Sequence, residues 1–324
     1  TDLVNTIDQS NVQLFYFYNR KRANFGGGFF HTKNFYLDNN DFLFSDRFYG
    51  LQGFLNYPFS IFKRVELTFS QYFIDRQYYD FNDPRRLNGG RSSKITTAEA
   101  SYIIDNIIWG ITGPINGRRA KLSFSGGKNL FDTKDIEYTA VDFDYRKYWH
   151  LKKTYSFAFR FSGGVSFGTT PKLYFLGGTT NWIGNRTLDA RVYEVENLYF
   201  ADVVTPLRGV PYYELSGNRY GLLNAEFRFP LIDYFAMRFP LPLTISRVQG
   251  VFFTDIGAAW FGDNFKGATG EGGNNRLNDI KFGFGVGMRM NLGFFLLRYD
   301  LAWTTDFYQI SDRPSYYFSF GADF

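Results

Sequence analysis

Apolar and polar residues alternate over long stretches of the chain, and the clearest example is its last segment. Tyr316, Phe318, Phe320 and Phe324 occupy alternate positions there, and most residues between them are small or polar. Successive side chains of a β-strand point to opposite faces, so this period of two predicts a strand with one aromatic face.

A second segment places aromatic residues against glycine. Phe282 and Phe284 alternate with Gly283, Gly285 and Gly287. We expect Phe282 and Phe284, like Phe318 and Phe320, to face outward, and the glycines to form a stripe of small residues on a barrel interior. The glycines lie in mid-strand, so they are not interpreted as a phosphate-binding loop.

Comparable alternation recurs from one end of the chain to the other. The further runs lie near residues 11–19, 23–33, 47–57, 63–77, 94–108, 118–130, 134–147, 153–168, 220–230, 247–260 and 295–303. Together they predict about 13 strands, whereas single-chain bacterial barrels have an even number. The odd count indicates either a strand missed within 169–219 or strands upstream of Thr1.

Alternation alone does not separate a soluble β-sandwich from a membrane barrel, but the connections do. Short turns are expected at Asn19–Arg22, His150–Lys153 and Asn291–Gly293, and long polar loops at Tyr78–Arg91, Asp263–Asn278 and Thr169–Arg219. Short turns at one end and long loops at the other are typical of transmembrane barrels. We therefore predict an all-β fold, a transmembrane antiparallel β-barrel over residues 1–324, with 169–219 as a long extracellular loop.

Composition supports this fold and excludes others. Of 324 residues, 40 are Phe, 24 Tyr and 5 Trp, which argues against disorder, and no apolar run approaches the ~20 residues of a membrane-spanning helix. The absence of helical spacing argues against a soluble α/β enzyme. The net charge of +5 is scattered through loops, so no nucleic-acid partner is predicted, and a basic rim facing anionic lipid fits equally well.

The sequence indicates no catalytic chemistry. Gly164–Gly168 matches the G-x-S-x-G pattern of serine hydrolases, but it lies inside an alternating strand, and the two histidines, His31 and His150, both precede it. Asp38 and Asp41 lack the ordered spacing of a calcium loop. We predict no enzyme activity, catalytic residue, cofactor or metal.

Three separated sequence motifs are specific enough to compare with a known family. They are Tyr102–Arg119 with its Asp-Asn and Pro-x-x-Gly turn, Tyr174–Gly178 followed later by Leu207-Arg208-Gly209, and Asn224–Pro230 with Phe253–Gly257 and Arg298–Ala302. Together they resemble the BamA-like outer-membrane assembly and translocation superfamily, of the bacterial surface antigen type. Leu55–Phe59 and Lys63–Leu67 are similar to a turn in members that carry a TolB-like propeller before the barrel. The resemblance implies a complete barrel of about 16 strands in the bacterial outer membrane. Upstream strands and a periplasmic domain are expected to lie outside this chain.

The resemblance also implies roles for particular residues. Leu207, Arg208 and Gly209 form the tip of the long loop, and Arg208 would fold into the lumen and pair with Glu226 and Asp255. A guanidinium between carboxylates in a confined space makes charge-assisted hydrogen bonds. The terminal strand, with Tyr316, Phe318, Phe320 and Phe324, resembles a recognition signal for outer-membrane assembly. The stretch between the glycine pair and the tip, Thr179 to Pro206, is long, so the loop is expected to make an extra excursion.

Three functions remain open at this point. The first is a BamA-like barrel that assists protein insertion into, or translocation across, the outer membrane through a strained seam between its first and last strands. The second is a non-insertase barrel that anchors a periplasmic propeller or serves as a subunit of a larger secretion or uptake complex. The third is a diffusion porin, which needs a charged constriction in a wide lumen. Periplasmic or outer-membrane proteins are the expected partners of the first two.

Overall fold

The structure, a computed structural model, describes residues 10–37, 43–79, 87–129, 136–152, 154–183, 199–238, 240, 243–269, 276–277, 279–293 and 295–322. Within these residues the fold is one large antiparallel sheet. Its strands in order are β1 (Val12–Tyr18), β2 (Asn24–Leu37), β3 (Leu43–Ser60), β4 (Lys63–Tyr79), β5 (Leu87–Asp105), β7 (Pro114–Lys128), β8 (Glu137–Lys152), β9 (Tyr155–Phe167), β13 (Arg219–Met237), β14 (Leu243–Trp260), β17 (Ile280–Asn291), β18 (Leu296–Thr305) and β19 (Ser315–Phe320). The short β6 (Ile108–Trp109) pairs with β7.

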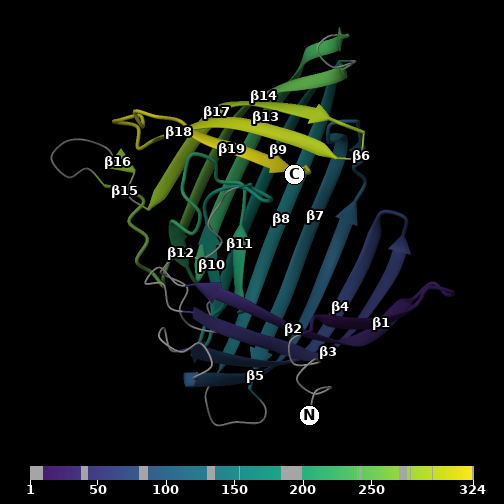
Figure 1. Cartoon of the computed structure of the whole chain (residues 1–324), viewed down its shortest axis with the longest axis vertical. Helices are drawn as coiled ribbons and strands as arrows, with labels where there is room; N and C mark the ends of the chain where they lie inside the picture. The colour runs from purple at the N-terminus through teal and green to yellow at the C-terminus, as the bar shows by residue number, and fades with distance from the viewer. Residues whose placement is uncertain are drawn as a thin grey trace.

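Neighbouring strands of this wall follow one another along the chain, and connections with short strands of their own separate β5 from β7, β9 from β13 and β14 from β17. Figure 1 shows long tilted strands that curve around an interior, with β1 and β19, the two ends of the order, apart from each other. No helix among the described residues is long and apolar enough to cross a membrane.

The two faces of the wall differ as the alternation predicts. On β19 the exposed fraction is 41% for Phe318 and 1% for its neighbour Tyr317, and on β13 it is 37% for Phe227 and 1% for Glu226. Gly283 is buried on the inner face, and the Phe284 ring stacks on Trp303 on the outer face. An aromatic outer face is the surface that a barrel turns to lipid.

The wall strands match the sequence prediction closely. Among the described residues thirteen strands lie on the main path, and the three predicted short turns separate β1 from β2, β8 from β9 and β17 from β18. Several strands extend beyond the predicted runs; β14 begins at Leu243, for example. Phe324 lies outside the described residues.

The long loop between β9 and β13 has secondary structure of its own. It contains β10 (Leu173–Leu176), β11 (Ala201–Val204) and β12 (Leu215–Gly217), which form a separate three-stranded sheet in the order β11-β10-β12. The idea that a wall strand lies hidden in 169–219 is therefore wrong for the described part of this region. A second small sheet, β15 (Ala268–Thr269) with β16 (Arg276–Leu277), lies in the loop after β14.

The loop sheet lies inside the curve of the wall, in the middle of the view in Figure 1. Tyr174, Leu176 and Leu207 of the loop are buried in one cluster with Tyr220 and Leu222 of β13. This apolar contact brings the loop against the inner face of the wall and sets the position of the site described next.

Candidate functional site in the barrel lumen

Polar and charged residues occupy the inner face of three wall strands. Asn224 and Glu226 lie on β13, Asp255 on β14 and Asp300 on β18, and each is at most 1% exposed. Their strands follow the alternation, so the residues on either side of each point to the outer face. Buried carboxylates are costly unless they are paired and hydrogen-bonded, so this face requires a cationic partner.

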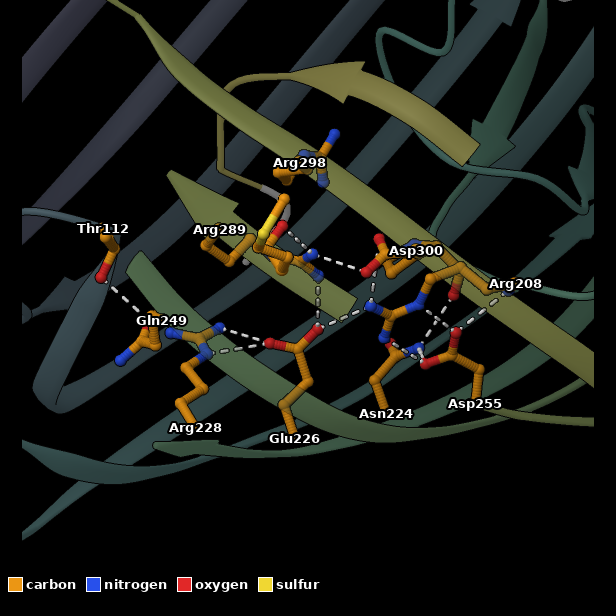
Figure 2. A network of polar contacts seen from close by, with 12 residues as sticks. Thr112, Arg208, Asn224, Glu226, Arg228, Gln249, Asp255, Arg289, Arg298 and Asp300 are labelled. Carbon is orange, nitrogen blue, oxygen red and sulfur yellow. Dashed lines mark hydrogen bonds and ion pairs between the residues drawn. The ribbon is translucent and has the colours of Figure 1, made fainter. Parts of the chain in front are cut away.

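Arg208 of the loop supplies that partner (Figure 2). Its Nε and Nη2 donate to the two oxygens of Asp255 at 2.7 and 2.9 Å, and its Nη1 donates to Oε1 of Glu226 at 2.8 Å. Its backbone N–H also donates to Asp255 at 3.0 Å. The Arg208 side chain is fully buried, and the guanidinium carbon lies 3.6 Å from the centre of the Phe253 ring. One loop residue thereby joins β13 to β14.

Two glycines allow the loop backbone to come this close to the wall. Gly209 has a φ of 90°, a conformation that residues with a side chain rarely adopt, and it lies against the Trp303 carbonyl. A methyl group at Gly283 would lie 1.9 Å from the carbonyl oxygen of Arg208. The glycine stripe of β17 therefore makes room for the loop tip.

The pairing continues along the inner face beyond Arg208. Arg228 donates from Nε to Oε2 of Glu226 at 2.9 Å, and Arg289 pairs with Asp300 at 2.5 Å and with Glu226 at 3.6 Å. Asp300 also lies 3.8 Å from Arg208. Arg208, Arg228 and Arg289 thus balance Glu226, Asp255 and Asp300, three positive charges against three negative ones. Removing one member leaves a buried charge without compensation.

The turn after β5 enters the same network from the other end of the barrel. Nη1 of Arg228 donates to the carbonyl oxygen of Pro114 at 2.9 Å, and the Thr112 hydroxyl donates to Gln249 of β14 at 2.9 Å. Asn291 of β17 donates to the carbonyl oxygen of Ile111 at 2.7 Å. The turn within Tyr102–Arg119, the first motif that resembles the family, therefore lies across the inner face. It contacts strands that are far from it in sequence.

A second region of the loop contacts the opposite part of the wall. Tyr199 stacks on Phe48 of β3 with ring centres 4.7 Å apart, and Phe200 is buried in a cluster that includes Ile74 and Ile95. Both residues lie in the stretch from Thr179 to Pro206, where an extra excursion of the loop was expected. The loop therefore contacts the wall at β3 to β5 as well as at β13, β14 and β18.

Lys172, at the start of the loop, adds a third contact. Its Nζ lies 2.5 Å from Asp202 of β11 and 3.4 Å from Asp142 of β8. Burial lowers the pKa of Lys172, but the two carboxylates outweigh burial and raise it above its ordinary value. The same residues line a polar cavity of about 450 Å³ next to Arg160 and Asp144, which form an ion pair of their own.

The serine of the G-x-S-x-G pattern has a structural role at the start of the loop. Ser166 is fully buried, and its hydroxyl accepts a hydrogen bond from the backbone N–H of Lys172 at 2.8 Å. Its strand, β9, continues into the loop without a helix. Asp38 and Asp41 lie outside the described residues.

The sequence named Leu207, Arg208, Gly209, Glu226 and Asp255, and the structure brings all five together. It adds three residues that sequence reasoning missed. Arg289 and Asp300 pair with each other, and the Tyr317 hydroxyl accepts a hydrogen bond from the backbone N–H of Gly209 at 2.8 Å. Their signal in the sequence was a polar group at an inward position of an otherwise apolar strand.

Fold and site together define a transmembrane antiparallel β-barrel whose long loop is held to the inner wall by a buried arginine. The profile of the Omp85 superfamily domain matches residues 4–324, and the chain belongs to this superfamily. It is therefore an outer-membrane barrel and not an enzyme, and the predicted fold class and location are confirmed.

A solved structure supports the same fold. The chain is similar to BamA from Haemophilus ducreyi lacking POTRA domains 1-3, with a TM-score of 0.63 and 14% sequence identity. The match covers 96% of this chain and 62% of that one, so the chain spans less than two thirds of the length of that structure. Comparison with curated protein sequences gives no match.

Proposed function

We propose that this barrel assists the insertion of proteins into the outer membrane or their translocation across it. The proposal rests chiefly on the Arg208 contact. A loop arginine that is fully buried between Glu226 and Asp255 fixes the tip of the long loop inside the barrel. Such a loop gives the interior a defined shape, and its contacts reach the strands next to the sheet edge at β19.

The packing of the loop weighs against a diffusion porin. Loop residues such as Tyr174, Leu176 and Leu207 bury apolar surface against β13, which leaves the interior occupied where a porin needs water. The alternative that remains is a non-insertase barrel. It would anchor a periplasmic TolB-like propeller or serve as a subunit of a larger secretion or uptake complex.

The proposed partners follow from the surface of the barrel. Exposed outer-face aromatics such as Phe252 and Phe318 suit the acyl chains of outer-membrane lipid and lipopolysaccharide. Client polypeptides from the periplasm would approach the end of the barrel that carries the short turns. The end that carries the 169–219 loop would then be extracellular.

Reconstitution tests the proposal. The full-length protein in lipid vesicles should protect an unfolded outer-membrane barrel client from added protease, and Arg208→Ala should reduce that protection strongly. Arg219→Ala is the matched control, because Arg219 pairs with the 94% exposed side chain of Asp263 at the surface. No protection above that of empty vesicles by the wild-type protein would contradict an insertase, and copurification with a propeller protein would then support the anchor.

The terminal strand is proposed as a recognition signal for the barrel's own assembly, through Tyr316, Phe318, Phe320 and Phe324. Deleting Phe324 should lower the folded yield in cells and leave refolding into detergent less affected. Equal losses in both settings would show that the residue acts through packing.

A further inference from the structure

The outer face of the wall has a hollow where β2 and β3 pair. Gly27 of β2 and Gly53 of β3 lie directly opposite each other, at positions that point outward. The exposed side chains of Phe29, Leu51 and Phe69 stand around them. With residues of β1 they line a mostly apolar hollow of about 530 Å³. Strands β1 and β4 border it, so it lies within the described wall.

The floor of this hollow leaves room for another molecule. A methyl group added at Gly53 would have one atom within 4 Å, the carbonyl oxygen of Gly26 at 3.9 Å. At Gly250, which also faces outward, the added methyl group would lie 2.5 Å from the ring of Phe229. An empty apolar space forfeits dispersion contacts, and the medium around this face is lipid. An acyl chain is therefore the expected occupant.

Basic side chains lie on the same outer face, nearer to the end of the wall that carries the long loop. Lys33 of β2 and Arg47 of β3 pair in register, and Asp75 of β4 lies beside Arg47. Lys94 of β5 is two residues from the position aligned with Asp75. Three positive charges thus face one negative charge, and this group is here called the basic row. It provides an attractive surface for anionic headgroups.

The distance between the hollow and the basic row matches one leaflet of a membrane. Lys33 lies six residues beyond Gly27 on β2. Six residues span about 20 Å along a strand, or about 14 Å in height at a tilt of about 45°. One leaflet contributes about 15 Å, half of the ~30 Å hydrocarbon core. In the orientation proposed above, the basic row lies at the surface of the outer leaflet and the hollow lies where its acyl chains end.

The guanidinium of Arg47 is held in place above the apolar surface. It lies 4.9 Å from the centre of the Tyr49 ring, which stacks on Phe73 at 5.3 Å. Its Nε donates to Nε2 of His31 at 3.0 Å. A guanidinium fixed in this way is a good partner for phosphate, because less freedom is lost when the ligand binds.

We propose that the outer face of β2 to β5 binds one molecule of lipid A, the phosphorylated and multiply acylated anchor of lipopolysaccharide. A phosphate group contacts Lys33 and Arg47, and an acyl chain fills the hollow at Gly27 and Gly53. The basic row extends over three strand spacings, about 14 Å, which fits a headgroup with more than one phosphate. The inference uses the orientation given under the proposed function and narrows the general lipid contact to one site.

The charge requirement is tested by native mass spectrometry of the full-length protein in detergent, titrated with lipid A. Lys33→Gln with Arg47→Gln should weaken binding ~30-fold, and lipid A without phosphates should bind the wild type as weakly. Lys63→Gln with Arg219→Gln is the matched control, because it removes two cations away from the site. Equal affinity of the wild type and the Lys33/Arg47 variant would overturn the proposal.

The hollow is tested by filling it. Gly53→Leu should weaken lipid A binding by about threefold, a small effect because an acyl chain that leaves the hollow for other hydrocarbon loses only van der Waals contacts. Gly221→Leu is the control, since an outward glycine with nothing within 4 Å of its added methyl group accepts a side chain equally well. A shift in gel mobility on heating confirms that both variants are folded. Equal affinity of the two leucine variants would remove the acyl chain from the hollow.

A third measurement identifies the lipid in the membrane itself. A photo-crosslinker at Leu51, on the rim of the hollow, is activated in outer membranes, and the adduct is identified by its mass. Lipid A should predominate, and the Lys33/Arg47 variant should lose that adduct. A predominant phosphatidylglycerol or phosphatidylethanolamine adduct would overturn the choice of lipid A. None of these measurements uses a client, so if client protection fails while lipid A binds as described, the proposed function fails and the lipid site stands.

Discussion

The loop meets the wall in two regions that are stabilised in different ways. At β13, β14 and β18, the clamp region, the loop brings the charge of Arg208 to carboxylates that need it. At β3 to β5, the aromatic region, the wall pairs its own buried charges, because Arg76 binds Asp46 through two hydrogen bonds of 2.7 Å. The loop adds the rings of Tyr199 and Phe200 there.

This difference shows which contact determines the position of the loop. Where the wall pairs its own buried charges, removal of the loop costs only packing contacts, and each of these contacts is individually weak. A wall that depends on the loop for charge balance is left with uncompensated carboxylates. The clamp region should therefore carry more of the docking free energy than the aromatic region.

The largest expected effect comes from removing the clamp charge. Arg208→Ala should lower the free energy of unfolding by ~3–5 kcal/mol, because it breaks a buried ion pair from one side. Urea unfolding in bilayers measures the loss, and protease cleavage within 169–219 should become faster. A loss no larger than that of the surface control Arg219→Ala would show that the clamp contributes little.

A smaller effect should follow from a change on the wall that leaves every charge in place. Gly283→Ala puts a methyl group 1.9 Å from the Arg208 carbonyl oxygen, so the loop tip must shift. We expect a loss of about 1–3 kcal/mol, the usual range for an overpacked site. Gly221→Ala is the matched control, since nothing lies within 4 Å of its added methyl group. Equal stability of the two variants would contradict the close approach of the tip.

The smallest effect is expected in the aromatic region. Tyr199→Leu keeps an apolar side chain but removes the stack on Phe48, which should cost about 0.5–1.5 kcal/mol. The same unfolding assay applies. A loss larger than that of Arg208→Ala would reverse the ranking of the two regions.

The wall was predictable from the sequence because its signal is local. Each strand shows its two faces through alternate residues, as Phe318 and Tyr317 do on β19, and lipid outside a barrel reinforces the contrast. The partners of Arg208 were predictable only because Leu207-Arg208-Gly209 and the other two motifs resemble the BamA-like superfamily.

The remaining contacts depend on information that a single strand does not carry. Arg289 and Asp300 meet because β17 and β18 pair in one particular register, and Tyr317 meets Gly209 because of the path of the loop. Trp182 and Tyr199 bind wall strands far away in sequence. Such contacts result from tertiary packing, which alternation does not encode.

The central claim is that Arg208 and Glu226 stabilise the docked loop as a pair, and a double-mutant cycle tests it most directly. Arg208→Ala, Glu226→Gln and the double variant are unfolded in bilayers, and the coupling free energy is taken from the four stabilities. The 2.8 Å contact predicts a coupling within the range of about 0.5–3 kcal/mol found for residues in one network, so that the second substitution costs much less once the first is present. Additive losses would contradict the clamp.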